Sequence, residues 1–115
     1  MNIVEEIIGE ILVEIVTGSR ATVKDSEMLK DLLNKKIDAG YKKIIIDLTE
    51  CEFIDSTFLG VLVNALRKTV KSGGDLKLVG FKPAVKAMFE LTRLFRVFET
   101  YNDLQDAIRS YTTEK

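Results

Sequence analysis

Residues 41–71 read YKKIIIDLTECEFIDSTFLGVLVNALRKTVK, and this stretch decides the fold. The continuous β-branched run Ile44-Ile45-Ile46 predicts a strand over residues 41–48 that is buried on both faces. A polar connection follows at residues 49–52, and apolar residues then recur at helical spacing over residues 58–71. A buried strand that leads into a helix through a short loop is typical of a parallel sheet with crossover helices.

The segments before and after this stretch continue the alternation. Two β-rich runs at residues 3–8 and 11–16 flank Gly9-Glu10, and a glycine in the first position of a two-residue loop predicts a type II′ hairpin turn. The remaining expected elements are a helix that is capped by Asp25 or Ser26 and stops at Gly40, a short strand at residues 76–79, a helix with Pro83 in its first position, a short strand at residues 95–98, and a closing helix capped by Asn102.

These elements together predict one α/β domain over residues 1–115. A chain of 115 residues is the size of a single domain and has no room for a second core. We expect a mostly parallel or mixed central sheet with an N-terminal β-hairpin and about four helices. In sheets of this kind, functional groups gather in the loops beyond the C-terminal ends of the strands, where residues 55–57 fall.

Composition and charge limit the kinds of partner. The chain has 17 basic and 18 acidic residues, a net charge of −1, and no basic stripe or tail, so we expect no nucleic-acid binding. No apolar run reaches the roughly 18–20 residues that span a bilayer, so we expect no membrane insertion. Cys51 is the only cysteine, and the N-terminus lacks the pattern of a secretory signal. We therefore expect a cytoplasmic protein.

The residue types that are missing limit the chemistry. Without any histidine, Ser-His-Asp catalysis, Cys-His catalysis and histidine-based zinc sites are excluded. No glycine-rich phosphate loop occurs, and the lone Cys51 has no base to activate it. The carboxylates around the loop, which are Asp47, Glu50, Glu52 and Asp55, are expected to be solvated rather than to hold Mg²⁺. We expect a non-enzymatic protein without metal or cofactor.

Ser56 stands where a helix begins, and two interpretations fit this position. A serine before an apolar-periodic run is usually only an N-cap. A phosphorylated serine there would also be tolerated by the fold, because the helix dipole and free N–H groups favour a dianion. Its new charge would then act on a binding surface. Phe58 is either a core residue or an exposed anchor for a partner, and its angle from the Leu59/Leu62/Leu66 face of the helix favours exposure.

The stretch FIDSTFLGVLV at residues 53–63 resembles the STAS domain of bacterial anti-sigma factor antagonists, whose signature is an Asp-Ser-[Ser/Thr]-Gly-Leu-Gly loop that opens a helix. The likeness continues through KSGGDLKL at residues 71–78 and PAVKAMF at residues 83–89, and it covers nearly the whole chain. Two departures stand out. Phe58 replaces the motif glycine, and Ser19-Arg20-Ala21-Thr22 stands where the family often carries an acidic residue.

The resemblance implies a regulatory function. Proteins of this kind bind an anti-sigma factor that is also a serine kinase and so release a sigma factor. Phosphorylation of the motif serine, here Ser56 with Thr57 as the alternative acceptor, ends binding, and a serine/threonine phosphatase restores it. The expected partner contacts are Asp55, Thr57, Phe58, Leu59, Gly60, Ser19, Arg20 and Thr22. The resemblance also favours a monomer. The alternative is a STAS scaffold subunit of a larger signalling or transport assembly.

Overall fold

The computed structural model describes residues 2–18, 20–21 and 23–112. Four α-helices, one 3₁₀ turn and seven strands alternate along this part of the chain. In chain order they are β1 (Asn2–Ile8), β2 (Ile11–Thr17), β3 (Arg20–Ala21), α1 (Val23–Asp38), β4 (Lys43–Asp47), β5 (Phe53–Ile54), α2 (Ser56–Lys71), β6 (Asp75–Val79), α3 (Pro83–Leu91), η1 (Leu94–Arg96), β7 (Glu99–Tyr101) and α4 (Leu104–Thr112).

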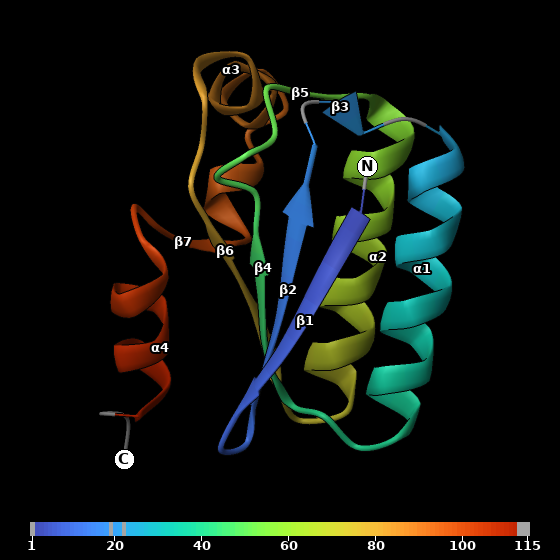
Figure 1. The fold of residues 1–115 in the computed structure, drawn as a ribbon, viewed down its shortest axis with the longest axis vertical. Coiled ribbons are helices and arrows are strands. Elements are labelled where there is room, and N and C mark those ends of the chain that lie inside the picture. The colour runs from blue at the N-terminus through green and yellow to red at the C-terminus, as the bar shows by residue number, and fades with distance from the viewer. Residues whose placement is uncertain (1, 19, 22, 113–115) are drawn as a thin grey trace.

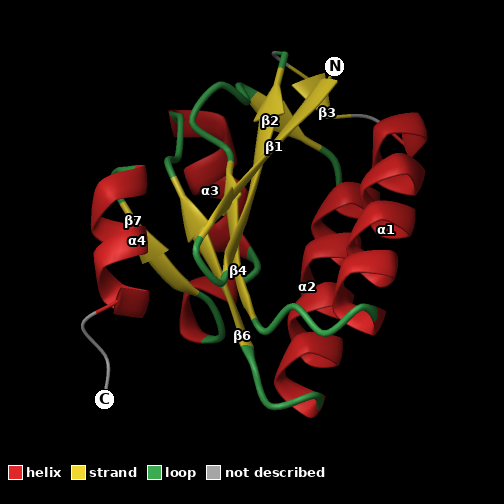
Figure 2. Cartoon of the chain, turned by 60° about the horizontal axis from the view of Figure 1, so that its bottom comes forward, coloured by secondary structure: helices red, strands yellow, loops and turns green. Residues whose placement is uncertain are grey.

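Five strands form the central sheet in the order β1-β2-β4-β6-β7. β1 and β2 pair antiparallel, and every other neighbouring pair is parallel, so the predicted mixed sheet with an N-terminal hairpin is confirmed. Helices α1 and α2 cover one face of this sheet, and α4 lies on the other (Figures 1 and 2). α3 lies at the end of the sheet where β5 and the start of α2 are found (Figure 1).

Local signals fixed several element boundaries. Gly9 has a φ of 61° at the first position of the hairpin loop, as a type II′ turn requires. Gly40 follows α1 with a φ of 104°, and its N–H donates to the Ile37 carbonyl at 3.0 Å. Pro83 occupies the first turn of α3. These three predictions are confirmed because each depends on the backbone conformation of a single residue.

Three predicted boundaries are wrong. α1 begins at Val23, so Asp25 and Ser26 lie inside its first turn and are not its cap. Asp103 caps α4 in place of Asn102, because its carboxylate accepts the Asp106 N–H at 2.9 Å. Residues 95–98 form no strand: η1 covers Leu94–Arg96, and the last strand starts at Glu99.

Burial of aromatic rings explains the misplaced strand. The ring of Phe95 packs within 5.4 Å of Phe81 and 5.6 Å of Phe89, measured between centroids. Phe98 lies 5.9 Å from Phe89 and is almost fully buried. A turn of 3₁₀ helix brings residues three apart onto the same side, so both rings reach the core, whereas a strand would point them to opposite faces.

The core has two parts, one on each face of the sheet. The larger lies between the sheet and helices α1, α2 and α3, and it contains the strand residues Ile44 and Ile46. The smaller lies beneath α4 and contains Ile45. Successive side chains of β4 therefore enter opposite cores, which is the two-sided burial predicted from the isoleucine run. Among the helices of the described residues, none is long and apolar enough to cross a bilayer.

Candidate functional site

The candidate site lies beyond the C-terminal ends of β4 and β6. The N–H of Leu48 donates to the Val79 carbonyl at 2.8 Å and extends the pairing past β4. Gly80 then passes directly under Thr49, since a Cβ on Gly80 would stand 2.8 Å from the Thr49 Cα. Gly80 also has a φ of 73°, so both space and backbone conformation require glycine. These contacts fix the start of the connection to α2.

The residues directly before the site form a second sheet, which has only two strands, β3 and β5. β5 pairs in parallel with β3, so that Phe53 lies opposite Arg20 and Ile54 lies opposite Ala21. The Ile54 side chain is buried and anchors the segment to the core. The pairing places the backbone of Arg20 beside Phe53, two residues before Asp55. Ser19 and Thr22, which were predicted as partner contacts, lie outside the described residues, and of Arg20 only the backbone is described.

Asp55 is the N-cap of α2, which corrects the assignment of that role to Ser56. Its backbone is extended, and its carboxylate accepts the Phe58 N–H at 2.8 Å. Ser56 and Thr57 are the first two residues of the helix, and both are exposed. An aspartate cap satisfies one N–H and places a negative charge at the positive end of the helix dipole. The Ser56 hydroxyl is therefore not needed as a cap.

Phe58 and Leu59 are core residues, so the predicted exposure of Phe58 is wrong. The Phe58 side chain is fully buried, and Leu59 is nearly so. At about 100° per residue, Phe58 lies about 40° from Leu62 on the helix, although it lies about 100° from Leu59. α2 buries a stripe wide enough to include both directions, since it packs against the sheet and α1 together. Neither side chain can reach a partner directly.

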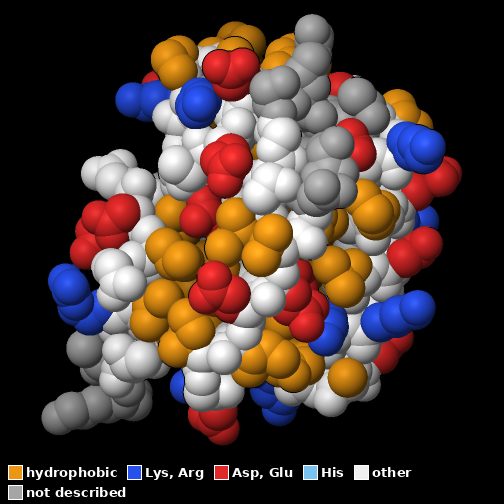
Figure 3. All heavy atoms as spheres, in the orientation of Figure 1, with side chains coloured by type: hydrophobic (Ala, Val, Ile, Leu, Met, Phe, Trp, Pro, Cys, Tyr) orange, Lys and Arg blue, Asp and Glu red, His pale blue; other side chains and the backbone are white. Residues whose placement is uncertain are grey.

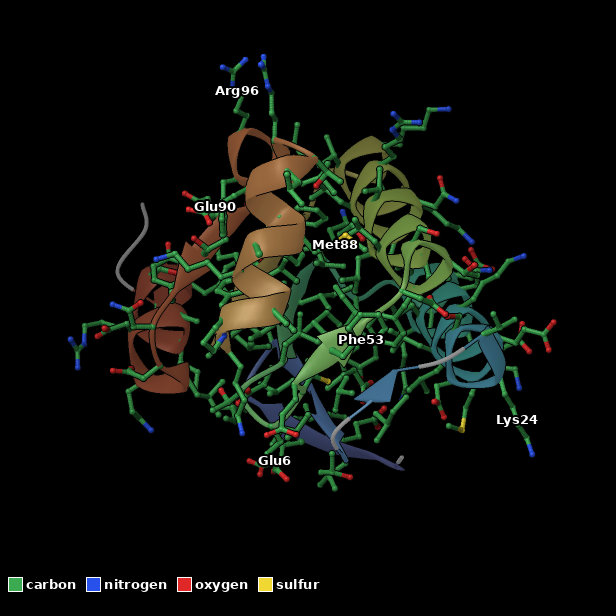
Figure 4. All side chains as sticks on the ribbon, turned by 90° about the horizontal axis from the view of Figure 1, so that it is seen from above. Glu6, Lys24, Phe53, Met88, Glu90 and Arg96 are labelled. Carbon is green, nitrogen blue, oxygen red and sulfur yellow. The ribbon has the colours of Figure 1, made fainter. Side chains whose placement is uncertain are left out.

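The exposed aromatic residue near the site is Phe53, which the sequence analysis did not single out. Its side chain is 41% exposed, while the neighbouring Ile54 is buried. Seen from above, Phe53 lies on β5 between α3 and β3 (Figure 4). The alternation of a two-residue strand, with one side chain in and one out, was the signal that could have identified it.

A hollow of about 360 Å³ lies between α1 and α2 and starts at the site. Thr57, Gly60 and Asn64 line it from α2, while Val23 and Lys30 line it from α1. A Cβ on Gly60 would meet no atom within 4 Å, so packing within this chain does not require glycine there. Thr57 and Gly60 thus share an open surface that continues from Ser56 into this hollow between α1 and α2.

The chemistry at the site is that of hydroxyls and scattered carboxylates. Within the described residues, no group of three or more Asp, Glu, Cys or His side chains is placed to hold a metal ion. Asp47 accepts the Thr49 N–H at 2.9 Å, and Glu52 lies 4.0 Å from the Lys82 ammonium. Burial, with smaller contributions from nearby carboxylates, raises the pKa of the Cys51 thiol to about 11, so it is protonated and unreactive at neutral pH.

Comparison with known proteins shows the family. The STAS domain family matches residues 6–107. This chain belongs to the STAS domain family. The chain is 28% identical over 104 residues, 90% of its length, to a Thermotoga maritima protein that carries the provisional name of anti-sigma factor antagonist, of which the match covers 91%.

Two solved structures place the STAS domain described here among known folds. An anti-sigma factor antagonist from Mycobacterium paratuberculosis superposes with a TM-score of 0.85 at 25% identity, over 95% of this chain and 92% of that one. Bacillus SpoIIAA in its phosphorylated form superposes with a TM-score of 0.77 at 19% identity, over 96% and 99% of the two chains. The second likeness concerns the fold alone.

Proposed function

We propose that this STAS domain is an anti-sigma factor antagonist that is switched by phosphorylation at Ser56. The unphosphorylated form binds an anti-sigma factor that is also a serine kinase, and so frees a sigma factor. Phosphorylation ends this binding, and a serine/threonine phosphatase restores it. The protein acts as a monomeric, non-enzymatic regulator in the cytoplasm. Family membership and the names of relatives at similar length support the general function.

The exposed hydroxyl at the first position of α2 carries the phosphorylation proposal. Ser56 is accessible to an approaching kinase, and Asp55 already caps the helix. The first-turn N–H groups of Ser56 and Thr57 have no carbonyl partner inside the helix. A phosphate on Ser56 would meet these donors and the positive end of a 16-residue helix, so the fold would tolerate it.

The effect of the phosphate would fall on the binding surface. Thr57 and Gly60 line the α1–α2 hollow, and Phe53 is exposed on β5, three residues before Ser56. We assign the partner contacts to Asp55, Thr57, Gly60 and Phe53, and we assign Phe58 and Leu59 the role of holding the helix start in place. About two negative charges at the centre of this surface would oppose association, and each 1.4 kcal/mol lost is about a tenfold weaker affinity.

A binding experiment with matched variants tests the proposal. We expect the wild type and Ser56→Ala to bind the anti-sigma factor of the same organism with similar affinity. Ser56→Asp and the enzymatically phosphorylated protein should bind at least tenfold more weakly in calorimetry. Ser72→Asp places the same substitution at the other end of α2 and should bind like the wild type. Ser56→Ala and Ser56→Asp should keep their melting temperature within a few degrees of the wild type.

Mass spectrometry after incubation with the kinase and ATP identifies the acceptor. Phosphate on Ser56 is the expected result, and phosphate on Thr57 would move the switch by one residue. A protein that takes up phosphate at neither position, or that binds equally well with phosphate on Ser56, would contradict the switch. Association with a large assembly regardless of phosphorylation would instead support the scaffold alternative.

A further inference from the structure

A second surface of the molecule is hollowed and apolar. It lies between the C-terminal half of α2 and the turn that contains η1, and its volume is about 690 Å³. Its floor and walls are formed by Val63, Leu66 and Val70 from α2 and by Leu94 and Val97 from the turn. Val70 and Val97 are 54% and 55% exposed, although both are aliphatic. Exposed apolar side chains that gather in one concavity mark a binding surface more often than scattered ones do.

The wall formed by the turn is held rigidly. Phe95 and Phe98 anchor it in the aromatic cluster, and the Val97 and Phe98 N–H groups both donate to the Leu94 carbonyl, at 3.1 and 3.2 Å. α2 supplies the other wall as a continuous helix. A partner would therefore meet a groove that is already formed, and little ordering of this chain would oppose binding.

The rim of the groove is basic. Arg67, Lys68 and Lys71 line it from α2, and no acidic residue is among the described residues that line it. Lys68 is paired with Asp38 at 2.9 Å, but Arg67 and Lys71 form no salt bridge within the part of the chain that the structure describes. Arg96, in the turn itself, projects away from the body of the molecule (Figure 4). The net charge of the whole chain is only −1, so this basic concentration is local.

We propose that this groove binds an acidic amphipathic helix of a partner protein. The apolar stripe of such a helix would fill the space above Val70, Leu94 and Val97, and its flanking carboxylates would meet the basic rim, as in other helix-in-groove complexes. A second copy of this chain would bring an identical basic rim and would be repelled. A bilayer would touch the rim, but its flat surface would not reach the apolar floor of a concavity.

The groove is separate from the proposed phosphorylation site. Ser56 does not line the groove, which begins on α2 at Val63, seven residues or about 10 Å along the helix from Ser56. The groove proposal therefore rests on the lining of the groove itself and does not depend on the switch at Ser56. The partner helix can belong to the protein that binds near Ser56 or to a different protein. In both cases it is acidic and amphipathic.

Nuclear magnetic resonance titration of the isotope-labelled chain tests the groove. The probes are two synthetic 18-residue helical peptides with the same leucine stripe, one with glutamates and one with lysines on the polar face. We expect the glutamate peptide to shift the amide signals of residues 63–71 and 94–97 and to bind at least tenfold more tightly than the lysine peptide. The double variant Arg67→Glu/Lys71→Glu should reverse this preference.

The matched control makes the same charge change on another helix. Lys24→Glu/Lys35→Glu on α1 should leave the preference for the glutamate peptide unchanged, and so should Ser56→Asp, which separates this test from that of the switch. Equal binding of both peptides, shifts outside the groove, or no shift by either peptide at 1 mM would overturn the proposal. Sedimentation of the chain with phosphatidylglycerol vesicles, without peptide binding, would overturn it in favour of a membrane surface.

Discussion

At the scale of single residues, the most unusual side chain is Glu14 on β2. It lies opposite Glu5 of β1 and is fully buried, and neither of its carboxylate oxygens accepts a hydrogen bond from a donor in the described part of the chain. Burial, and then the neighbouring Glu5, raise the pKa of Glu14 to about 8. The hydrogen bond that the protonated Glu14 carboxyl donates to Glu5 and, next, the Lys36 ammonium, which pairs with Glu5 at 2.9 Å, hold the pKa of Glu5 below its ordinary value. Glu14 is thus protonated in the folded state at neutral pH.

This burial predicts a stability that falls as the pH rises. The unfolded chain releases the Glu14 proton near pH 4.5, while the folded chain keeps it until about pH 8. The free energy of unfolding should therefore decrease between these values and level off above them. Glu14→Gln, measured by urea unfolding at pH 5, 7 and 9, should remove most of this decrease. Glu27→Gln on the surface of α1 is the control, and identical slopes for Glu14→Gln and wild type would contradict the assignment.

At the scale of elements, α4 is fastened to the sheet by a few polar contacts around Tyr111. The Tyr111 hydroxyl lies 3.0 Å from the Ile44 carbonyl and 2.8 Å from the Asp75 carbonyl, at the neighbouring strands β4 and β6. The buried ammonium of Lys77 lies 4.0 Å from the Tyr111 ring centroid and donates to Ser110 at 2.8 Å. The core beneath α4 is the smaller of the two, which makes these contacts important for the position of the helix.

Removal of the Tyr111 hydroxyl should loosen α4 without unfolding the domain. We expect Tyr111→Phe to lower the free energy of unfolding by about 1–2 kcal/mol, because two carbonyls lose their buried partner. Chemical denaturation measures the change, and hydrogen exchange should accelerate first in residues 104–112. Tyr101→Phe removes a hydroxyl from the same face and should have little effect. An unchanged stability for Tyr111→Phe would show that apolar packing and the Lys77–Ser110 contact hold the helix without the Tyr111 hydroxyl.

At the scale of the whole molecule, β1 is an edge strand with an unpaired outer side. Val4, Ile7 and Ile8 are exposed on it, and apolar side chains surround acidic ones on this face of the molecule (Figure 3). Glu6 lies between Val4 and Ile8 on the same face of the strand and is exposed. Charged residues on an apolar edge strand oppose pairing with another chain.

Loss of this charge should therefore promote self-association. We expect Glu6→Val to shift the protein toward oligomers or aggregates in size-exclusion chromatography with light scattering, increasingly with concentration. Asp31→Val, the matched change on the exposed surface of α1, should leave the elution unchanged. An unchanged elution for Glu6→Val would show that the twist or Glu5, the other acidic residue of β1, protects the edge.

How far the sequence predicted this molecule depended on the range of the interactions involved. The hairpin at Gly9, the end of α1 at Gly40 and the start of α3 at Pro83 follow from the conformations that single residues prefer. The predicted cap of α2, Ser56, is one residue away from the observed cap, Asp55. The two were not distinguished because aspartate and serine are both favoured at a capping position. The boundaries near Asp25 and Phe95 were misplaced, because packing decides between neighbouring capping residues and between strand and turn.

The amino-acid order alone determined the alternation of strands and helices, the mixed sheet and the placement of a serine near the start of α2. These features depend on periodicity and backbone preference, which each segment carries by itself. Tertiary structure alone decided that Phe58 is inside and Phe53 outside, that Glu14 lies buried beside Glu5, and that α2 and the η1 turn enclose a basic-rimmed groove. Such features arise where distant segments meet, because burial is set by what packs against a residue and not by its neighbours along the chain.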